Sequence, residues 1–245
     1  MSLFISILIL GFLLGLRHAT DSDHVVAVTT ITARQKHIKG STIIGALWGI
    51  GHSATVTLVG VPIISFSLKI PAKLGLGLEF IVGIMLVVLG FINLYSMRFQ
   101  IAGMFSNFLH KHIHSHDKSK EHSHLHVHFQ KQTNNQIHHL SFFQISRPIF
   151  VGLIHGLAGS SAIALLILTT IHSAKLAGFY LIIFNIGVIV GMMIITTLLG
   201  ISIKLANKKI SFIHKYLVSG SGVLSFVFGL FIMYHIGFVD GLFGI

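Results

Sequence analysis

The sequence predicts an all-α integral membrane protein with six transmembrane helices in two inverted three-helix repeats. The membrane class follows from composition, because 53% of the 245 residues are hydrophobic, 9% are charged and the mean hydropathy is +0.86. A soluble domain of this size cannot hide so much apolar surface. A helix of about 20 residues crosses a hydrocarbon core of about 30 Å. Six apolar segments reach that length, at residues 3–33, 42–67, 75–97, 148–171, 175–204 and 213–236.

An internal repeat predicts the arrangement of these segments. Each unit has three helices, an odd number, so the second copy is expected to be inverted in the membrane. Chance similarity among glycine-rich membrane helices is the alternative. The predicted units are residues 1–97, a His-rich loop at 98–147, and residues 148–245. The matches pair Gly15-Leu-Arg-His18 with Gly152-Leu-Ile-His155, Ile50-Gly51 with Ile186-Gly187, and Gly83 and Gly90 with Gly222 and Gly229.

The first segment carries five ionisable side chains within eight residues: Arg17, His18, Asp21, Asp23 and His24. Ionisable groups are costly in hydrocarbon, so they need partners, water or a bound ion. Imidazoles and carboxylates together suit divalent first-row metals such as nickel, cobalt or zinc. A buried network that only fixes helix packing is the alternative reading.

The spacing within this segment favours a metal site. His18, Asp21 and His24 lie within an arc of about 120° on one helix face and can converge on one ion. Asp23 points elsewhere in a regular helix, so it either orients a histidine or requires an irregular helix near Gly15. About 30 apolar residues exceed a straight span, which again predicts tilt or a break at the polar centre. Arg17 is expected to pair with Asp21, four residues on.

Further candidate ligands lie in the other segments. His52 falls near the middle of the second segment, which favours a role as ligand or as partner of Asp23. His155 is the only ionisable residue that the second repeat retains, and it is either a ligand or a histidine bonded to neighbouring backbone. Asn185 lies at a matching depth in the fifth segment and can line the ion path.

The loop at residues 98–147 is rich in histidine, with ten of the eighteen histidines between His110 and His139. Its Lys, Ser, Gln and Asn residues favour a disordered tether. Neutral imidazoles chelate nickel, cobalt, copper and zinc with little selectivity, so the loop is expected to capture metal. The expected capture residues are His110, His112, His114, His116, His122, His124, His126 and His128.

Three short motifs resemble a known family. His18-Ala-Thr-Asp-Ser-Asp23-His24 fits the signature of the nickel/cobalt transporter superfamily, the NiCoT/NicO proteins, in which a histidine and an Asp-His pair are separated by four residues. Trp48-Gly-Ile-Gly-His-Ser-Ala-Thr-Val56 resembles its second signature. His155-Gly-Leu-Ala-Gly-Ser-Ser-Ala162 is similar to the third signature of the UreH-like urease accessory permease branch. The resemblance implies transport of nickel or cobalt that depends on the His and Asp residues of the first signature. Many members have eight helices rather than six.

Charge and cysteine content restrict the partners. The absence of cysteine leaves only nitrogen and oxygen ligands for a metal. The formal charge of +11 is better explained by orientation in an anionic membrane than by nucleic acid, because the basic residues lie in loops. Residues 1–16 lack the basic start of a signal peptide, so the first segment is expected to be retained.

The distribution of basic residues predicts the orientation. Lys69, Lys73 and Lys175 lie on one side of the membrane, and the positive-inside rule puts that side and both termini outside. The His-rich loop is then cytoplasmic, in a multi-pass protein of the cell membrane. Thirteen of the seventeen basic residues lie on the cytoplasmic side: Arg34, Lys36, Lys39, Arg98, Lys111, Lys118, Lys120, Lys131, Arg147, Lys204, Lys208, Lys209 and Lys215.

The leading functional prediction is a secondary transporter of nickel or cobalt, with import favoured and metal carried by His18, Asp21, Asp23, His24 and His52. The ion is then substrate, and no permanently bound cofactor is expected. The alternatives are efflux, or a membrane metal sensor or accessory protein that passes nickel to a metallochaperone or to urease maturation proteins. A membrane metalloprotease is disfavoured because the sequence contains no His-Glu-x-x-His pair. The sequence also contains no Walker motif, so the chain itself is not expected to use ATP.

Overall fold

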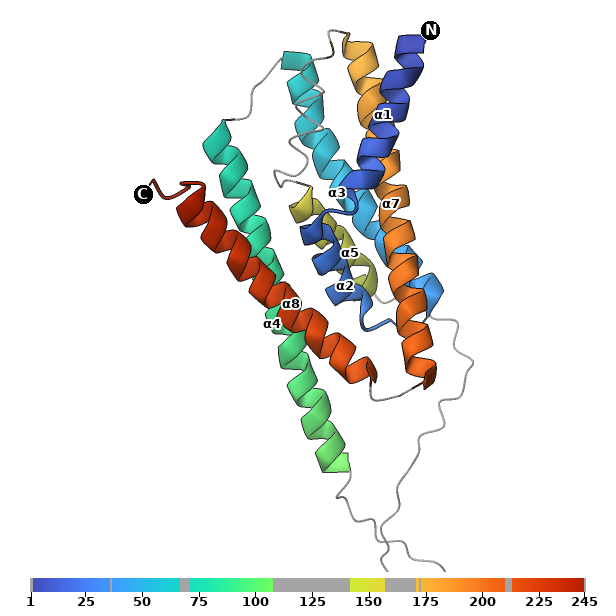
Figure 1. Cartoon of the computed structure of the whole chain (residues 1–245), viewed down its shortest axis with the longest axis vertical. Helices are drawn as coiled ribbons and strands as arrows, with labels where there is room; N and C mark the ends of the chain where they lie inside the picture. The colour runs from blue at the N-terminus through green and yellow to red at the C-terminus, as the bar shows by residue number, and fades with distance from the viewer. Residues whose placement is uncertain are drawn as a thin grey trace, which may run out of the picture.

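The computed structural model describes residues 2–35, 37–66, 71–107, 142–156, 171, 173–209 and 213–244. Every regular element within these residues is a helix, which confirms the all-α prediction. In Figure 1, α4 and α8 cross on one side, α1, α3 and α7 lie on the other, and the short α2 and α5 lie between. The elements are α1 (Ser2–His18), α2 (Ser22–Thr32), α3 (Ile38–Phe66), α4 (Ala72–Asn107), α5 (Phe142–His155), α7 (Ala174–Lys209), α8 (Ile213–Tyr234) and the π-helical turn η2 (His235–Val239).

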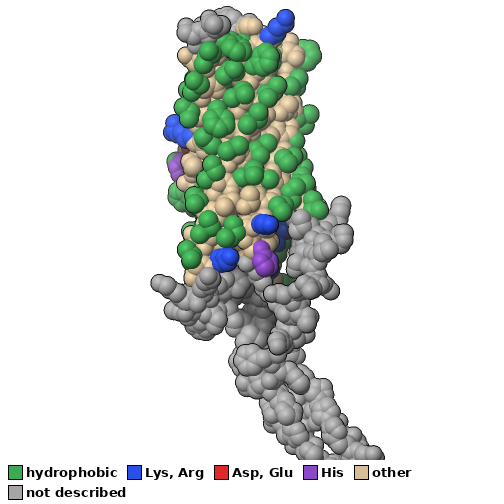
Figure 2. All heavy atoms as spheres, turned by 90° about the vertical axis from the view of Figure 1, so that its right-hand side faces the viewer, with side chains coloured by type: hydrophobic (Ala, Val, Ile, Leu, Met, Phe, Trp, Pro, Cys, Tyr) green, Lys and Arg blue, Asp and Glu red, His purple; other side chains and the backbone are tan. Residues whose placement is uncertain are grey.

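Four of the described helices are long and apolar enough to span a membrane, namely α3, α4, α7 and α8. The pair α1 and α2 passes the same test as one bent span, which makes five. The helix α5 is apolar but shorter, and the predicted segment 148–171 is described continuously only as far as Gly156. Figure 2 shows hydrophobic side chains over most of one long face, with few Lys or Arg among them. A surface this apolar suits lipid rather than water.

The predicted break in the first segment is confirmed, and it lies at residues 19–21 rather than at Gly15. The axes of α1 and α2 meet at 56°. The amide groups of Thr20 and Asp21 donate to the carbonyl oxygens of Arg17 and His18 at 2.8 and 3.1 Å, which tightens the chain after α1. Asp21 then leaves the helical region, with φ −58° and ψ 145°, and α2 begins after it.

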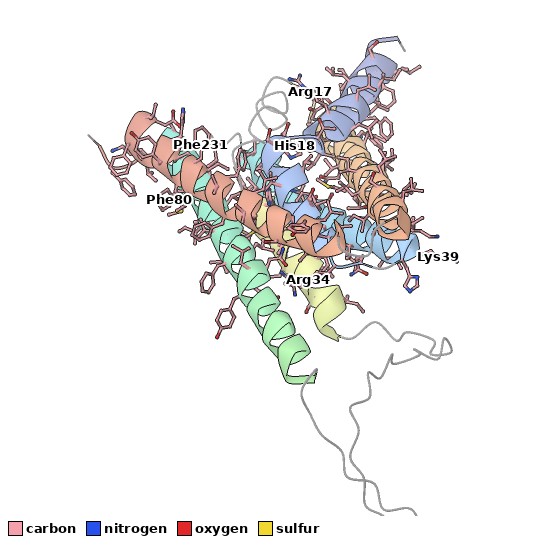
Figure 3. All side chains as sticks on the ribbon, turned by 60° about the horizontal axis from the view of Figure 1, so that its bottom comes forward. Arg17, His18, Arg34, Lys39, Phe80 and Phe231 are labelled. Carbon is pink, nitrogen blue, oxygen red and sulfur yellow. The ribbon has the colours of Figure 1, made fainter. Side chains whose placement is uncertain are left out.

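The predicted pair of Arg17 and Asp21 is wrong, and the break explains why. A spacing of four residues brings side chains together only on a continuous helix. Asp21 instead pairs with His18, and Arg17 is exposed. In Figure 3, His18 lies at the junction of α1 and α2, while Arg17 projects away from it.

The helices on either side of the predicted loop extend further into it than hydropathy suggested. The helix α4 continues to Asn107 and α5 begins at Phe142, so both enter the range 98–147. Hydropathy detects the part of a helix that lies in lipid, whereas helical hydrogen bonds continue into water. All eight predicted capture histidines, from His110 to His128, lie outside the described residues.

Glycines allow the helices that carry the site to approach closely. A Cβ atom on Gly15 would lie 2.2 Å from the carbonyl oxygen of Phe184, where α1 meets α7. A Cβ atom on Gly152 would lie 2.1 Å from the carbonyl oxygen of Trp48, where α5 meets α3. Neither contact tolerates a side chain, as is usual where membrane helices pack through small residues. These two contacts hold the ends of α1 and α5 close to their neighbours.

Candidate metal centre

His18 ends α1 and connects two other polar groups. Its Nδ1 atom lies 2.9 Å from Asp21 Oδ2, and its Nε2 atom lies 3.1 Å from His52 Nε2 on α3. The side chain of Asp21 is 36% exposed, whereas His52 is completely buried. The break after α1 therefore places Asp21 behind the His18 ring, on the side away from His52.

Asp23 connects two further histidines. Its Oδ1 atom lies 3.0 Å from His24 Nδ1, and its Oδ2 atom lies 3.0 Å from His155 Nε2 at the end of α5. Both rings are completely buried. The structure thus brings His155 to the predicted first-segment residues, with a carboxylate as its partner.

The four imidazoles form one cluster around His24. The centroid of the His24 ring lies 4.5 Å from those of His18 and His155 and 5.3 Å from that of His52. Trp48 covers one side, because its ring lies 4.9 Å from His24 and stacks on His52 at 5.3 Å. This role of Trp48 was not predicted from the sequence. Its only sequence signal is the spacing of four residues from His52, which puts both on one face of α3.

The hydrogen bonds fix the tautomers of neutral rings, because an ionised carboxylate only accepts. The N–H groups of His18 Nδ1, His24 Nδ1 and His155 Nε2 then donate to Asp21 or Asp23, and His52 Nε2 donates to His18 Nε2. Within the described residues, this leaves a lone pair without a partner on each of three buried ring nitrogens, His24 Nε2, His52 Nδ1 and His155 Nδ1. An unsatisfied buried polar group costs about 1–3 kcal/mol, so the empty cluster favours a ligand that accepts lone pairs.

The geometry fits a small divalent cation. Two ligand sets have all their donor atoms within 4.8 Å of one another: His18, His24 and His52, and also Asp23, His24 and His155. Two nitrogens that each lie about 2.1 Å from one ion at angles of 90–109° are about 3.0–3.4 Å apart. The distance of 3.1 Å between His18 Nε2 and His52 Nε2 falls in this range. Nitrogen and carboxylate donors without sulfur suit nickel, cobalt or zinc.

Two predicted residues stand apart from these sets. Asp21 is in neither, although it bonds to His18. Asn185 on α7 donates from Nδ2 to Thr57 Oγ1 at 2.9 Å and is not hydrogen-bonded to any of the four imidazoles within the described residues. The expectation that His18, Asp21 and His24 share one face of a continuous helix is also wrong, because the break separates His18 from α2.

The fold and the site together define a multi-span helical membrane protein with a buried His/Asp cluster suited to a divalent metal ion. Residues 4–219 match the family described as high-affinity nickel-transport protein, NicO. The chain is 38% identical over 239 residues to the urease accessory protein UreH of Bacillus sp. (strain TB-90), which covers 98% of this chain and 95% of that protein. The chain belongs to the NicO nickel-transport family, and it is a membrane permease of the nickel/cobalt type. No solved structure matches it.

Proposed function

We propose that nickel or cobalt crosses the membrane through the buried cluster, with His18, His24, His52 and His155 as ligands. Asp23 either ligates directly or orients His24 and His155, and Asp21 orients His18. The observation that carries this proposal is the convergence of four buried imidazoles, three ring nitrogens of which have no hydrogen-bond partner among the described residues. Hydrogen bonds from ligand histidines to carboxylates are the usual support of a metal site.

The two overlapping ligand sets suggest how an ion moves. Both sets contain His24, so an ion bound to His18 and His52 can pass to Asp23 and His155 without leaving that ring. Transport requires sites that bind well enough to attract an ion and weakly enough to release it. Two adjacent sites with a shared ligand meet this requirement better than one closed tetrahedral site.

We further propose the inverted repeat as the framework of the carrier. Reciprocal contacts support it: a Cβ on Gly187 would lie 2.4 Å from Phe12 O, and a Cβ on the matching Gly51 would lie 2.3 Å from Ile149 O. The sequence repeat matches Gly83 with Gly222 and Gly90 with Gly229. The contacts between α4 and α8 join these positions crosswise, because Gly83 meets Gly229 and Gly90 meets Gly222. A two-fold axis in the membrane plane produces such exchange.

The proposed orientation puts both termini outside and the loop at residues 98–147 in the cytoplasm, between the two repeats. Import is the proposed direction, and the loop captures incoming metal. The name of the UreH relative refers to a urease accessory protein. A second proposal is therefore that this chain supplies nickel to a metallochaperone or to urease maturation proteins in the same cell.

Uptake of radioactive nickel into proteoliposomes tests the transport site. His24→Ala is expected to abolish uptake while the protein still inserts, because His24 is common to both ligand sets. His37→Ala, which removes an exposed histidine between α2 and α3, is the matched control and should transport normally. Normal uptake by His24→Ala would show that the ion does not cross the membrane through the cluster.

The loop is tested separately by deleting residues 110–139. If the loop only captures metal, uptake persists at high nickel and weakens when nickel is scarce. Loss at every concentration would show that the loop belongs to the transport path. Comparison of inward and outward oriented protein in the same vesicles gives the direction.

A further inference from the structure

A cavity of about 420 Å³ lies between α2, α4 and α8 and is lined at one point by Asp23, which belongs to the His/Asp cluster. Four of its lining residues are ionisable, namely Asp23, Glu79, His235 and Asp240. Its walls are otherwise mainly apolar and include Phe231, which Figure 3 shows on α8 beside α4. We call it the acidic cavity.

Negative charge is concentrated in this cavity. The described residues contain four carboxylates, and three of them line the acidic cavity, whereas no Lys or Arg does. The cavity is thus an acidic region in a chain whose formal net charge is +11. Its low-dielectric walls strengthen the attraction between these carboxylates and a cation. Glu79 is only partly exposed and lies on a membrane-spanning helix. An ionisable group is costly there, so Glu79 is not an ordinary surface charge.

The cavity has an outer and an inner end. His235 Nδ1 and Asp240 Oδ2 are 3.0 Å apart with side chains 48% and 38% exposed, so this pair lies at the outer end. Asp23, with a side chain 17% exposed, is the inner end. Asp23 contacts His24 and His155, each of which has one ring nitrogen without a partner among the described residues. The cavity thus extends from exposed acidic groups to the carboxylate that contacts two buried histidines.

The outer groups act on a hydrated ion rather than a bare one. Glu79, His235 and Asp240 belong to neither compact ligand set within the described residues. One water molecule needs roughly 10–15 Å³ of such a cavity, so an ion with six waters needs less than about 90 Å³. The available volume is several times larger.

We propose that the acidic cavity is the access path by which a hydrated divalent cation reaches Asp23, with Glu79 and the His235–Asp240 pair attracting it through its water shell. The inference rests on the proposed function of the Asp23, His24 and His155 cluster. The ion loses water stepwise as it passes from carboxylates to imidazoles. On the proposed orientation, this path opens to the outside.

Single cysteines test the path, because the chain has none of its own. Ile232→Cys places a thiol in the cavity, and Leu230→Cys places one on an exposed, lipid-facing position of the same helix. The full-length protein in vesicles is treated with a cationic, membrane-impermeant methanethiosulfonate. We expect rapid reaction of Ile232→Cys, slow reaction of Leu230→Cys and protection of the former by nickel. Equal reaction of the two, or no reaction at Ile232→Cys, would overturn the path.

Transport kinetics test Glu79. In water, a unit charge attracts a divalent ion at about 8 Å as strongly as two single charges of opposite sign attract each other at about 4 Å. This attraction corresponds to about a fivefold change in affinity. Glu79→Gln is therefore expected to raise KM for nickel about fivefold with unchanged maximal rate, and Glu79→Asp is expected to restore it. A fall in maximal rate without a change in KM would contradict the role in access.

Combining the variants separates this inference from the proposed function. With His24→Ala added, Ile232→Cys should still react rapidly but lose its protection by nickel. If His24→Ala transports normally while Ile232→Cys is labelled and Glu79→Gln raises KM, the cluster assignment fails and the access path stands. If His24→Ala abolishes transport and Ile232→Cys is inert, the cluster stands and the path fails.

Discussion

Asp23→Asn removes the carboxylate on which two histidines depend while keeping its shape. The carboxylate accepts one hydrogen bond from His24 Nδ1 and another from His155 Nε2, each at 3.0 Å. An asparagine amide has one accepting oxygen and one donating nitrogen. One of the two rings must therefore present a lone pair to the amide, and its other nitrogen then carries a hydrogen. Either His24 Nε2 or His155 Nδ1 is lost as a metal ligand.

The expected loss is large enough to measure. Removing the hydrogen-bond partner of a metal ligand typically costs about 10–100-fold in affinity, or about 1.4–2.7 kcal/mol. Loss of the negative charge beside a divalent ion acts in the same direction. We expect nickel affinity to fall by at least tenfold, measured by calorimetry on a variant without residues 110–139, so that the loop histidines do not contribute.

Asp21→Asn is the matched control for this experiment. Asp21 accepts from one ring only, at His18 Nδ1, and its side chain is 36% exposed. The carbonyl oxygen of asparagine can replace that single bond, so affinity should change little. Equal losses in the two variants would show that general negative charge matters rather than the tautomers. An unchanged affinity in Asp23→Asn would refute the reasoning.

Three further changes test the packing and the chemistry. Gly152→Ala should lower the stability of the protein by about 1–3 kcal/mol and displace His155, because the added Cβ would lie 2.1 Å from a carbonyl oxygen. Thermal unfolding measures the loss, and Gly178→Ala, where the added Cβ meets open space, is the control. Nickel binding to the loop-deleted protein should weaken as pH falls from about 8 to 5, since a protonated imidazole has no lone pair for the ion, and constant binding would assign the ion to oxygen ligands. Arg34→Ala should destabilise the protein by about 1–3 kcal/mol, because Arg34 donates to the side chain and backbone of the buried Asn93 at 2.7 and 2.9 Å, and chemical unfolding in detergent checks this.

The sequence predicted which histidines belong to the buried cluster but not the way they meet. His18, His24 and His52 were identified because ionisable residues in apolar segments require a reason. Their meeting depends on a break at residues 19–21, and hydropathy indicated only that some irregularity was needed. The local turn contains neither proline nor glycine between His18 and Ser22, so no residue type marked its position.

Residues brought in by tertiary packing were harder to predict. The position of His155 in the cluster depends on the contact of Gly152 with α3, which spacing along one helix cannot reveal. Glu79 and Asp240 are far apart in the sequence and line one cavity only because α4 packs along α8. For Glu79 and Asp240 the available signal was a carboxylate in or beside an apolar segment. Such a signal indicates that the residue has a function but not which residues it lies near.

If the cluster is the ion site, as proposed above, its empty state explains why this chain suits transport better than storage. Three buried ring nitrogens lack partners in the part of the chain that the structure describes, so the metal-free state carries an energetic cost that binding relieves. The same rings also bond to one another and to two carboxylates, so an ion must displace the contact between His18 Nε2 and His52 Nε2 when it enters between them. When the ion leaves, that contact re-forms and offsets part of the lost coordination. A site that is only partly satisfied when empty, and that competes with its own hydrogen bonds when full, holds an ion less tightly than a closed structural site.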